Sequence, residues 1–241
     1  MASTLNNEYL STDGGNDTAS GLMRPVAFPL APELAVPVHS SLYLVLKRCF
    51  DIALSGYALV ILAPVFLLVA LLISFSDGLP ILYRQRRIGR HGTEFWIYKF
   101  RTMRKDADEI LKSSPALREQ FEKNFKLDRD PRIIGPGKWL RELSIDELPQ
   151  LWNVLKGEMS IVGPRPVLRH ELTTMYGVDA AFYEAVKPGC AGLWQCSGRN
   201  DTTYKERIEL DKEYVRRASM RFDFEICCKT FVAVALRRGA K

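Results

Sequence analysis

The chain has 241 residues, of which 26% are charged and 47% are hydrophobic, and 34 Lys and Arg against 28 Asp and Glu give a net charge of +6. This length can bury a substantial core, which excludes a peptide hormone or a small disulfide scaffold and favours one domain with or without appendages. The basic balance indicates an anionic partner, with nucleic acid, a phosphate-bearing substrate and a membrane surface as alternatives. The five cysteines form no C-x-x-C pair and no Cys/His set with zinc spacing, which favours a reducing compartment.

Residues 1–40 have the composition of a flexible leader. The first half is rich in Ser, Thr, Asn, Asp and Gly, and the second half adds prolines among scattered apolar residues. Arg24 is the sole Lys or Arg in this stretch, and the prolines interrupt the apolar residues, so we recognise no secretory signal. We therefore expect the N-terminus to stay in the cytoplasm.

The first strong signal is an apolar run without any charged residue from Ile52 to Phe75. At about 1.5 Å per residue, the run is long enough to cross a hydrocarbon core of roughly 30 Å. Pro64 lies near its centre and leaves the carbonyl of Val60 without its helical donor, which divides the run into two arms that are each too short to cross alone. We therefore expect residues 41–78 to form a helix–break–helix membrane anchor.

Basic residues flank the apolar run on both sides. Lys47 and Arg48 precede it, and a group of arginines follows it, at Arg84, Arg86, Arg87 and Arg90. A spanning helix normally keeps its basic flank on the cytoplasmic side alone. The pattern therefore favours a re-entrant hairpin that enters and leaves one leaflet, with an ordinary span kinked at Pro64 as the alternative.

Residues 79–241 alternate strand-like and helical patterns, which predicts a mixed, helix-rich α/β domain. Residues 81–103 predict two strands around a turn at His91–Gly92, and residues 104–127 predict a charged helix interrupted at Pro115. Further helices are expected near residue 139 and over residues 148–156, 201–217 and 221–238. The last of these either packs on the core or lies on a membrane surface as an interfacial amphipathic helix, and its sequence favours neither.

The stretch that begins at Arg141 carries the residues best suited to catalysis. Ser144 and Glu147 have the spacing of a capping box, and Asp146 as the N-cap would put Pro149 in the tolerated first turn. Either register places Asp146 and Glu147 at a helix N-terminus, where the helix dipole favours ionised carboxylates. Asp146 is therefore a candidate nucleophile or Mg²⁺ ligand, with a purely capping role for both acids as the simpler interpretation.

Several basic residues lie in or beside turns rich in Gly and Pro. Arg165 stands between Pro164 and Pro166, so its backbone is restricted and its side chain extends from a stiff loop. Its planar guanidinium matches two phosphate oxygens, although a surface turn with a solvated arginine has the same sequence. We take five residues as candidates for binding the phosphates of a substrate: Lys99, Arg101, Arg141, Arg165 and Arg199.

Six motifs in this order resemble those of the bacterial sugar transferases, also called monotopic phosphoglycosyl transferases. The resemblance runs from about Lys47 to the C-terminus, and each motif alone is weak, whereas the ordered set is specific. The motifs are YRQRRIG (83–89), KFRTM (99–103), DPRI (130–133), LRELSIDELPQ (140–150), GPRP (163–166) and KPG…GLWQ…SGRN (187–200). The chain differs from some members at Ala63, in place of Ser, and at Cys190–Ala191, in place of Ile-Thr.

The resemblance implies a catalytic domain that faces the cytoplasm and is set on a re-entrant helix in the inner membrane. It also implies transfer of hexose-1-phosphate, with galactose or glucose as the sugar, from a UDP-sugar to undecaprenyl phosphate. UMP would be released in this initiating step of exopolysaccharide synthesis. In the covalent mechanism that the resemblance implies, Asp146 attacks the β-phosphorus, and Asp146 and Glu147 bind Mg²⁺.

Two interpretations without catalysis compete with this one. A membrane-tethered basic protein that binds anionic lipid or nucleic acid explains the charge and the apolar run, but not the acidic pair of Asp146 and Glu147 among arginines. A non-catalytic assembly factor for polysaccharide export is the second. Release of UMP from a UDP-sugar separates both from an enzyme, and we expect no nucleic-acid partner. The sequence indicates no oligomeric state.

Overall fold

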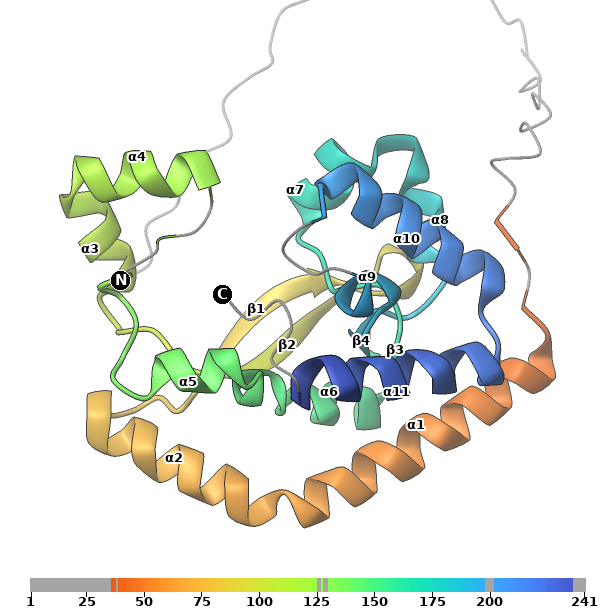
Figure 1. Ribbon diagram of the computed structural model, residues 1–241, viewed down its shortest axis with the longest axis horizontal. Coiled ribbons are helices and arrows are strands. Elements are labelled where there is room, and N and C mark those ends of the chain that lie inside the picture. Colours follow the sequence, from red (N-terminus) through yellow and green to blue (C-terminus); the bar gives the residue numbers. More distant parts are fainter. Residues whose placement is uncertain (1–35, 38, 125–126, 128–129, 198–201, 236–241) are drawn as a thin grey trace, which may run out of the picture. The chain divides into compact units, whose positions relative to one another are not determined.

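The structure, a computed structural model, describes residues 36–235 apart from residues 38, 125–126, 128–129 and 198–201 (Figure 1). The leader predicted over residues 1–40 falls almost wholly outside this part of the chain. The same holds for Arg199, one of the five candidate phosphate ligands.

Two helices joined by a sharp bend form the anchor segment. Helix α1 covers Ser41–Ile61 and helix α2 covers Ala63–Asp77, and the two are bent by 59°. Pro64 lies in the first turn of α2, where its missing N–H has no intrahelical partner to lose. The predicted helix–break–helix is therefore confirmed. Among the described residues no single helix has the length and apolar composition to cross a membrane, whereas this bent pair meets that criterion when taken together.

Two small sheets form the centre of the remaining fold. Strands β1 (Leu82–Ile88) and β2 (Glu94–Phe100) make an antiparallel hairpin. Their connection includes His91 and Gly92, both with positive φ, as a tight turn requires. Strands β3 (Ser160–Val162) and β4 (Gly189–Ala191) pair in parallel. The strand pair predicted over residues 81–103 is confirmed, and Figure 1 shows it between the helices.

Short helices surround these sheets. Pro115 begins α4, which confirms the interruption predicted within residues 104–127, and Gly157, with φ of 87°, ends α6 as predicted. The helices predicted over residues 201–217 and 221–238 correspond to α10 and α11. The full set is α3 (Ala107–Ser113), α4 (Pro115–Asn124), α5 (Gly137–Glu142), α6 (Gln150–Lys156), α7 (Arg169–Glu171), α8 (Ala180–Glu184), α9 (Leu193–Cys196), α10 (Tyr204–Arg217) and α11 (Met220–Ala235).

Both arms of the bent helix pair pack on this domain. Helix α1 contacts α6, β3 and α11, near a core that includes Ile97, Val154, Val162, Tyr214 and Ile226. Helix α2 buries two residues, Val69 and Ile73, in a separate cluster with Phe100, Ile134 and Leu140. Both arms pack on the same folded domain. The first residues of α1 and the last residues of α2 therefore lie on the side of the bend where that domain is.

Polar contacts strengthen the attachment of α1. Lys47 forms a 2.9 Å ion pair with the buried Asp223 of α11. Arg48 donates hydrogen bonds of 2.7 and 2.8 Å to the carbonyl oxygens of Val154 and Leu155 in α6. The basic flank that suggested membrane topology thus also has a structural role, which the sequence alone did not indicate.

Candidate active site

The acidic pair lies in a separate turn between α5 and α6. Ile145, Asp146 and Glu147 form one 3₁₀ turn, and Ser144 before it adopts a left-handed conformation with φ of 55°. The Ser144 side chain makes no capping hydrogen bond, and the N-cap position of α6 is Pro149. The predicted capping box and the predicted N-cap role of Asp146 are both wrong, because the chain reverses at Ser144 before α6 begins.

Asp146 is harder to ionise than an ordinary aspartate. Its side chain is buried, with 8% of the residue exposed. Burial raises the pKa of Asp146 to about 6, and the neighbouring charge of Glu147 acts in the same direction, against the opposing charges of Lys99 and Arg141. The prediction that a helix dipole favours the ionised form is therefore corrected. With a pKa near 6, the carboxylate still predominates at neutral pH.

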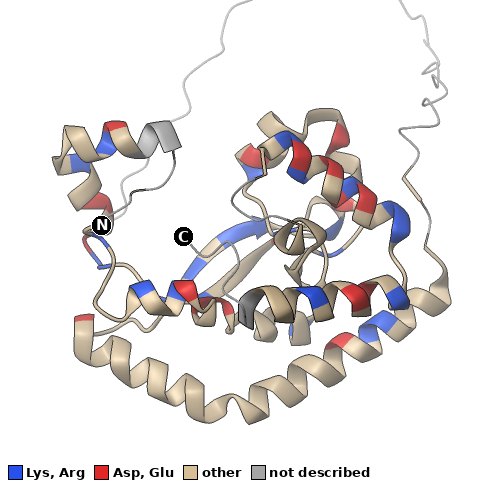
Figure 2. Cartoon of the chain, viewed as in Figure 1, with Lys and Arg blue, Asp and Glu red and all other residues tan. Residues whose placement is uncertain are grey.

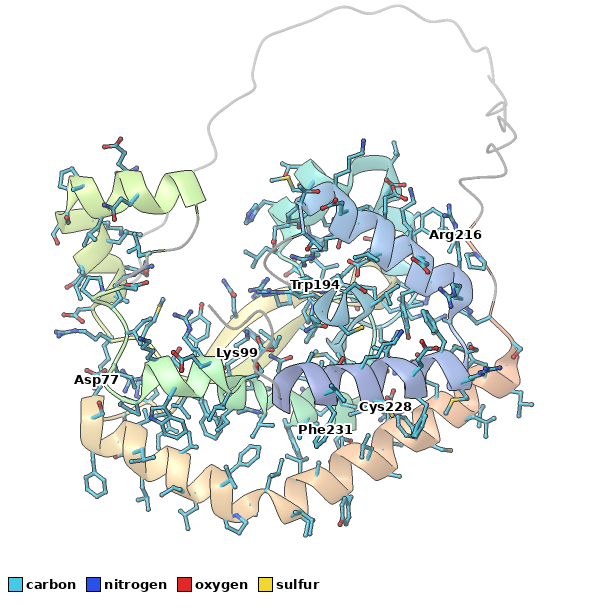
Figure 3. The ribbon with its side chains drawn as sticks, in the orientation of Figure 1. Asp77, Lys99, Trp194, Arg216, Cys228 and Phe231 are labelled. Atoms are coloured by element: carbon cyan, nitrogen blue, oxygen red, sulfur yellow. The ribbon has the colours of Figure 1, made fainter. Side chains whose placement is uncertain are left out.

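Two of the predicted basic residues accompany the acidic pair. Lys99, on β2, places its Nζ atom 2.6 Å from Oε1 of Glu147, and Figure 3 labels this lysine at the end of the hairpin. Arg141 is exposed on α5, and its charge reaches both Asp146 and Asp130. The structure thus brings Lys99, which is distant in sequence, to the segment that carries Arg141 and the two carboxylates, an arrangement suited to a phosphate-bearing substrate.

Arg101 has a structural role in place of the predicted phosphate-binding role. Its Nε donates to the carbonyl of Pro80 at 2.6 Å. Its two terminal nitrogens contact the Asp77 carboxylate and backbone carbonyls of Asp77, Gly78 and Met103. These contacts use all five N–H groups that a guanidinium offers, so Arg101 holds the end of α2 against β2 and has none to give a phosphate in this conformation.

Arg165 extends from the loop that follows β3. Gly163 permits the close approach of this loop to the Lys187–Gly189 turn, because an added Cβ would lie 2.3 Å from the carbonyl oxygen of Lys187. The Arg165 guanidinium lies 5.8 Å from the centre of the Trp194 ring, on α9. The loop therefore packs closely on the Lys187–Gly189 turn, and its arginine faces an aromatic side chain.

Arg207 also faces Trp194 and was missed by the sequence analysis. Its guanidinium lies 4.8 Å from the Trp194 ring and 5.1 Å from the Tyr204 ring. Residues 201–217 read as a charged, solvated helix, so one arginine among many did not stand out. The aromatic residue three positions before it was the only local sign that this side chain lies against the protein.

The acidic pair fits the way proteins bind Mg²⁺. Across the described residues no group of three or more His, Cys, Asp or Glu is arranged to hold a metal ion. Mg²⁺ is commonly held by one or two carboxylates, with substrate phosphates and water completing its shell. Asp146 and Glu147 offer two adjacent carboxylates beside candidate phosphate ligands, so the donor set suits this ion.

Comparison with known proteins identifies the family. The family model described as bacterial sugar transferase matches residues 42–237. The chain is 49% identical over 198 residues to the exopolysaccharide production protein ExoY of Sinorhizobium fredii, a match that covers 80% of this chain and 87% of that protein. It is 45% identical over 199 residues to the undecaprenyl-phosphate galactose phosphotransferase of Salmonella typhimurium, covering 81% and 41% of the two chains. It is 36% identical over 208 residues to the undecaprenyl-phosphate glucose phosphotransferase of Komagataeibacter xylinus, covering 80% and 36%. As the six motifs indicated, the chain belongs to the bacterial sugar transferase family.

Proposed function

We propose that this protein transfers hexose-1-phosphate from a UDP-sugar to undecaprenyl phosphate and releases UMP, as the initiating step of exopolysaccharide synthesis. Galactose or glucose is the sugar, as in the names of two relatives. The observation that carries the proposal is the buried Asp146 beside Glu147, with Lys99 and Arg141 within electrostatic reach. Carboxylates with a raised pKa beside cations are typical of functional sites, which favours an enzyme over a lipid-binding or assembly protein.

The anchor supports a position at the cytoplasmic face of the inner membrane. The side of α1 and α2 away from the domain exposes large apolar residues, and Figure 2 shows α2 without charge except at its end. An apolar surface of this kind is typical of a membrane contact. Since both outer ends are held by the same domain, we propose that the pair enters and leaves one leaflet. The exposed residues include Val60, Ile61, Leu67, Leu68 and Phe75.

The sequence of helix α11 left open whether it packs on the core or lies on a membrane surface, and its two faces differ in this respect. Phe222 and Ile226 are buried in the core, so one face packs on the domain. The other face exposes Phe224, Phe231 and Val232, and Figure 3 labels Phe231 on the side of the helix that faces α1 and α2. We propose that this second face lies at the membrane surface beside the anchor.

The proposed chemistry uses Asp146 as the nucleophile in two displacement steps. A carboxylate oxygen of Asp146 forms a bond to the β-phosphorus of the UDP-sugar, and the bond from this phosphorus to the bridging oxygen breaks, so that UMP leaves. An oxygen of undecaprenyl phosphate then attacks the same phosphorus and releases the carboxylate, which yields the lipid diphosphate sugar. The two steps let a soluble and a lipid substrate use one site in turn.

The surrounding residues would manage charge during both steps. Lys99 and Arg141 offset the negative charge of the diphosphate, and Lys99 also holds Glu147 in place through their ion pair. Mg²⁺, held by Asp146 and Glu147, would neutralise the diphosphate and the departing UMP. Burial keeps Asp146 away from bulk water, so its carboxylate is less solvated than at the surface.

A burst experiment tests the proposal. Purified enzyme given a UDP-sugar without lipid should release about one UMP per active site and keep the sugar phosphate covalently bound, as a two-step mechanism requires. Asp146→Asn should abolish the burst, and Glu147→Gln should weaken it in a way that added Mg²⁺ partly restores. Asp106→Asn, which alters an acid outside the site, is the control and should leave the burst unchanged.

Two different results would contradict the proposed function. UMP release that strictly requires undecaprenyl phosphate would mean direct transfer without a covalent intermediate. The absence of any UMP release from a panel of UDP-sugars, with lipid present, would favour the binding or assembly protein.

A further inference from the structure

Two arginines from different parts of the chain face the ring of Trp194. Arg165 reaches it from the loop after β3, at 5.8 Å, and Arg207 reaches it from α10, at 4.8 Å. Arg87, on β1, lies close enough for the charge of Arg165 to lower its pKa, in addition to the larger effect of burial. Two guanidinium groups therefore face one aromatic residue, which Figure 3 labels, and a third guanidinium lies within electrostatic reach of Arg165.

The hydrogen-bonding groups of this cluster are not satisfied within the protein. Atoms Nε and Nη2 of Arg207 are buried without an acceptor anywhere in the described part of the chain, and the same holds for Nε1 of Trp194 and Nε of Arg87. Native proteins pair nearly all buried donors, and an exception calls for a specific explanation such as a bound ion. Several unpaired donors at one place indicate a missing acceptor.

The nearby acids do not supply that acceptor. Asp211, one turn beyond Arg207 on α10, interacts with its charge, but the hydrogen bond to this carboxylate comes from the hydroxyl of Tyr176 at 2.6 Å. Glu171 pairs with Arg87 at 3.4 Å through Nη1 and leaves the Nε of Arg87 unpaired. In this conformation the acids reduce the positive charge without accepting from these donors, and Oδ1 of Asp211 is likewise buried without a partner among the described residues.

The cluster lies where α/β proteins bind ligands. Val162 ends β3 and Ala191 ends β4, and because these strands are parallel, the segments that carry Arg165 and Trp194 leave the sheet at the same edge. Ligands of open α/β sheets characteristically bind at the carboxyl ends of strands. The charges of Glu147 and Lys99 act on the thiol of Cys190, on β4, so this strand lies within electrostatic reach of the acidic pair.

We propose that Arg207, with Arg165 and the indole N–H of Trp194, binds a phosphate group of the nucleotide part of the sugar donor. The inference rests on the proposed function and adds a substrate-binding residue to it. The soluble nucleotide is favoured over the lipid phosphate because α10, which carries Arg207, lies on the far side of the domain from α1 and α2 in Figure 1. The principal contacts of α10 are with α8, α9 and the turn at Leu172–Tyr176, away from the anchor.

Calorimetric titration tests this site. Arg207→Gln should weaken binding of UDP and of UMP at least about tenfold, because a charge-assisted hydrogen bond is lost, and should leave binding of uridine unchanged. Arg217→Gln is the matched control, since Arg217 lies on the same helix, 4.3 Å from the Phe222 ring and paired with Glu213. It should bind UDP as the wild type does.

A second measurement covers the case in which Arg207→Gln does not fold. In the wild-type enzyme UDP should change the tryptophan fluorescence, and Trp194→Phe should remove that change. Arg207→Lys, which keeps the charge and loses the planar set of donors, should show an intermediate loss of UDP affinity.

Other outcomes would contradict either the proposed role of Arg207 or the proposed function, and each can be told from the others. Unchanged UDP affinity in Arg207→Gln with a lowered unfolding midpoint would assign the arginine a structural role. Unchanged UDP affinity with weaker use of undecaprenyl phosphate would assign it to the lipid. Wild-type protein that binds UDP through Arg207 but releases no UMP would refute the proposed function and leave the anion site standing.

Discussion

Asp51, in the middle of α1, accepts a 3.0 Å hydrogen bond from the hydroxyl of Ser160 at the start of β3. The same carboxylate oxygen accepts a 2.9 Å hydrogen bond from the backbone N–H of Ile161. Because β3 leads directly into the loop that carries Arg165, this contact connects the anchor helix with the proposed substrate site. The anchor and the loop that carries Arg165 are thus parts of one packed unit.

The first prediction concerns the stability of this connection. Asp51→Ala leaves the buried donors of Ser160 and Ile161 without their acceptor, which should lower the free energy of unfolding by about 2–4 kcal/mol. Asp51→Asn keeps an acceptor oxygen and should lose less than half of that. Denaturant unfolding in detergent measures both, and an unchanged midpoint for Asp51→Ala would mean that the contact contributes nothing.

The second prediction concerns the topology of the anchor. In a variant without native cysteines, single cysteines at Val45 and at Tyr83, both exposed, should resist a membrane-impermeant maleimide added from the periplasm, because both adjoin the domain that we propose faces the cytoplasm. Permeabilised cells provide the control in which both should react. Periplasmic labelling at one position and not at the other would establish a spanning helix. Pro64→Leu should favour such a span by restoring a continuous helix.

The third prediction concerns Asp146 and pH in enzyme freed of metal by EDTA. Its pKa is about 6 in the folded protein against an ordinary value of 3.8, so the folded state binds this proton more tightly than the unfolded state. The resulting stability is fully present below pH 3.8 and is lost as the pH rises through 6, by up to about 3 kcal/mol. Asp146→Asn should therefore be more stable than wild type at pH 7.5, with a smaller difference at pH 4.

The control for the third prediction is Asp106→Asn, since Asp106 is partly exposed and paired with Arg104, which lowers its pKa. This variant should show no gain at pH 7.5. If Asp146→Asn were no more stable than wild type at either pH, the raised pKa would be wrong.

Local patterns predicted the parts of the fold that depend on neighbouring residues. The β1–β2 hairpin follows from strand-like segments around the turn at His91–Gly92, and the bend of the anchor follows from Pro64. The end of α6 follows from Gly157 in the same way. In each case the conformational restriction of one residue decides the outcome, so no tertiary information is needed.

Tertiary contacts decide the rest, and the sequence does not reveal them. The acidic pair was expected to cap a helix, but Ser144 reverses the chain first, and the burial of Asp146 then outweighs any dipole effect. Arg101 has the sequence context of a phosphate ligand, but in the structure its guanidinium pairs with Asp77, which is distant in sequence. Arg207 is set apart from the other arginines of its helix by its contact with Trp194 and by its buried donors, neither of which the sequence reveals.

The fourth prediction concerns Arg165, which is held by the rigid loop after β3 and faces Trp194. Arg165→Lys keeps the positive charge but loses the planar pair of donors that matches two phosphate oxygens, so kcat/KM for the UDP-sugar should fall at least about tenfold. Arg169→Lys, four residues along, is the matched control, because Arg169 is exposed and pairs with Glu94 on the surface. The control should keep wild-type kinetics, since exposed ion pairs contribute little.

If Arg165→Lys also keeps wild-type kinetics while Arg165→Gln does not, the site needs only a charge at this position, and the bidentate contact must be abandoned. If both keep them, Arg165 is a solvated arginine in a surface turn.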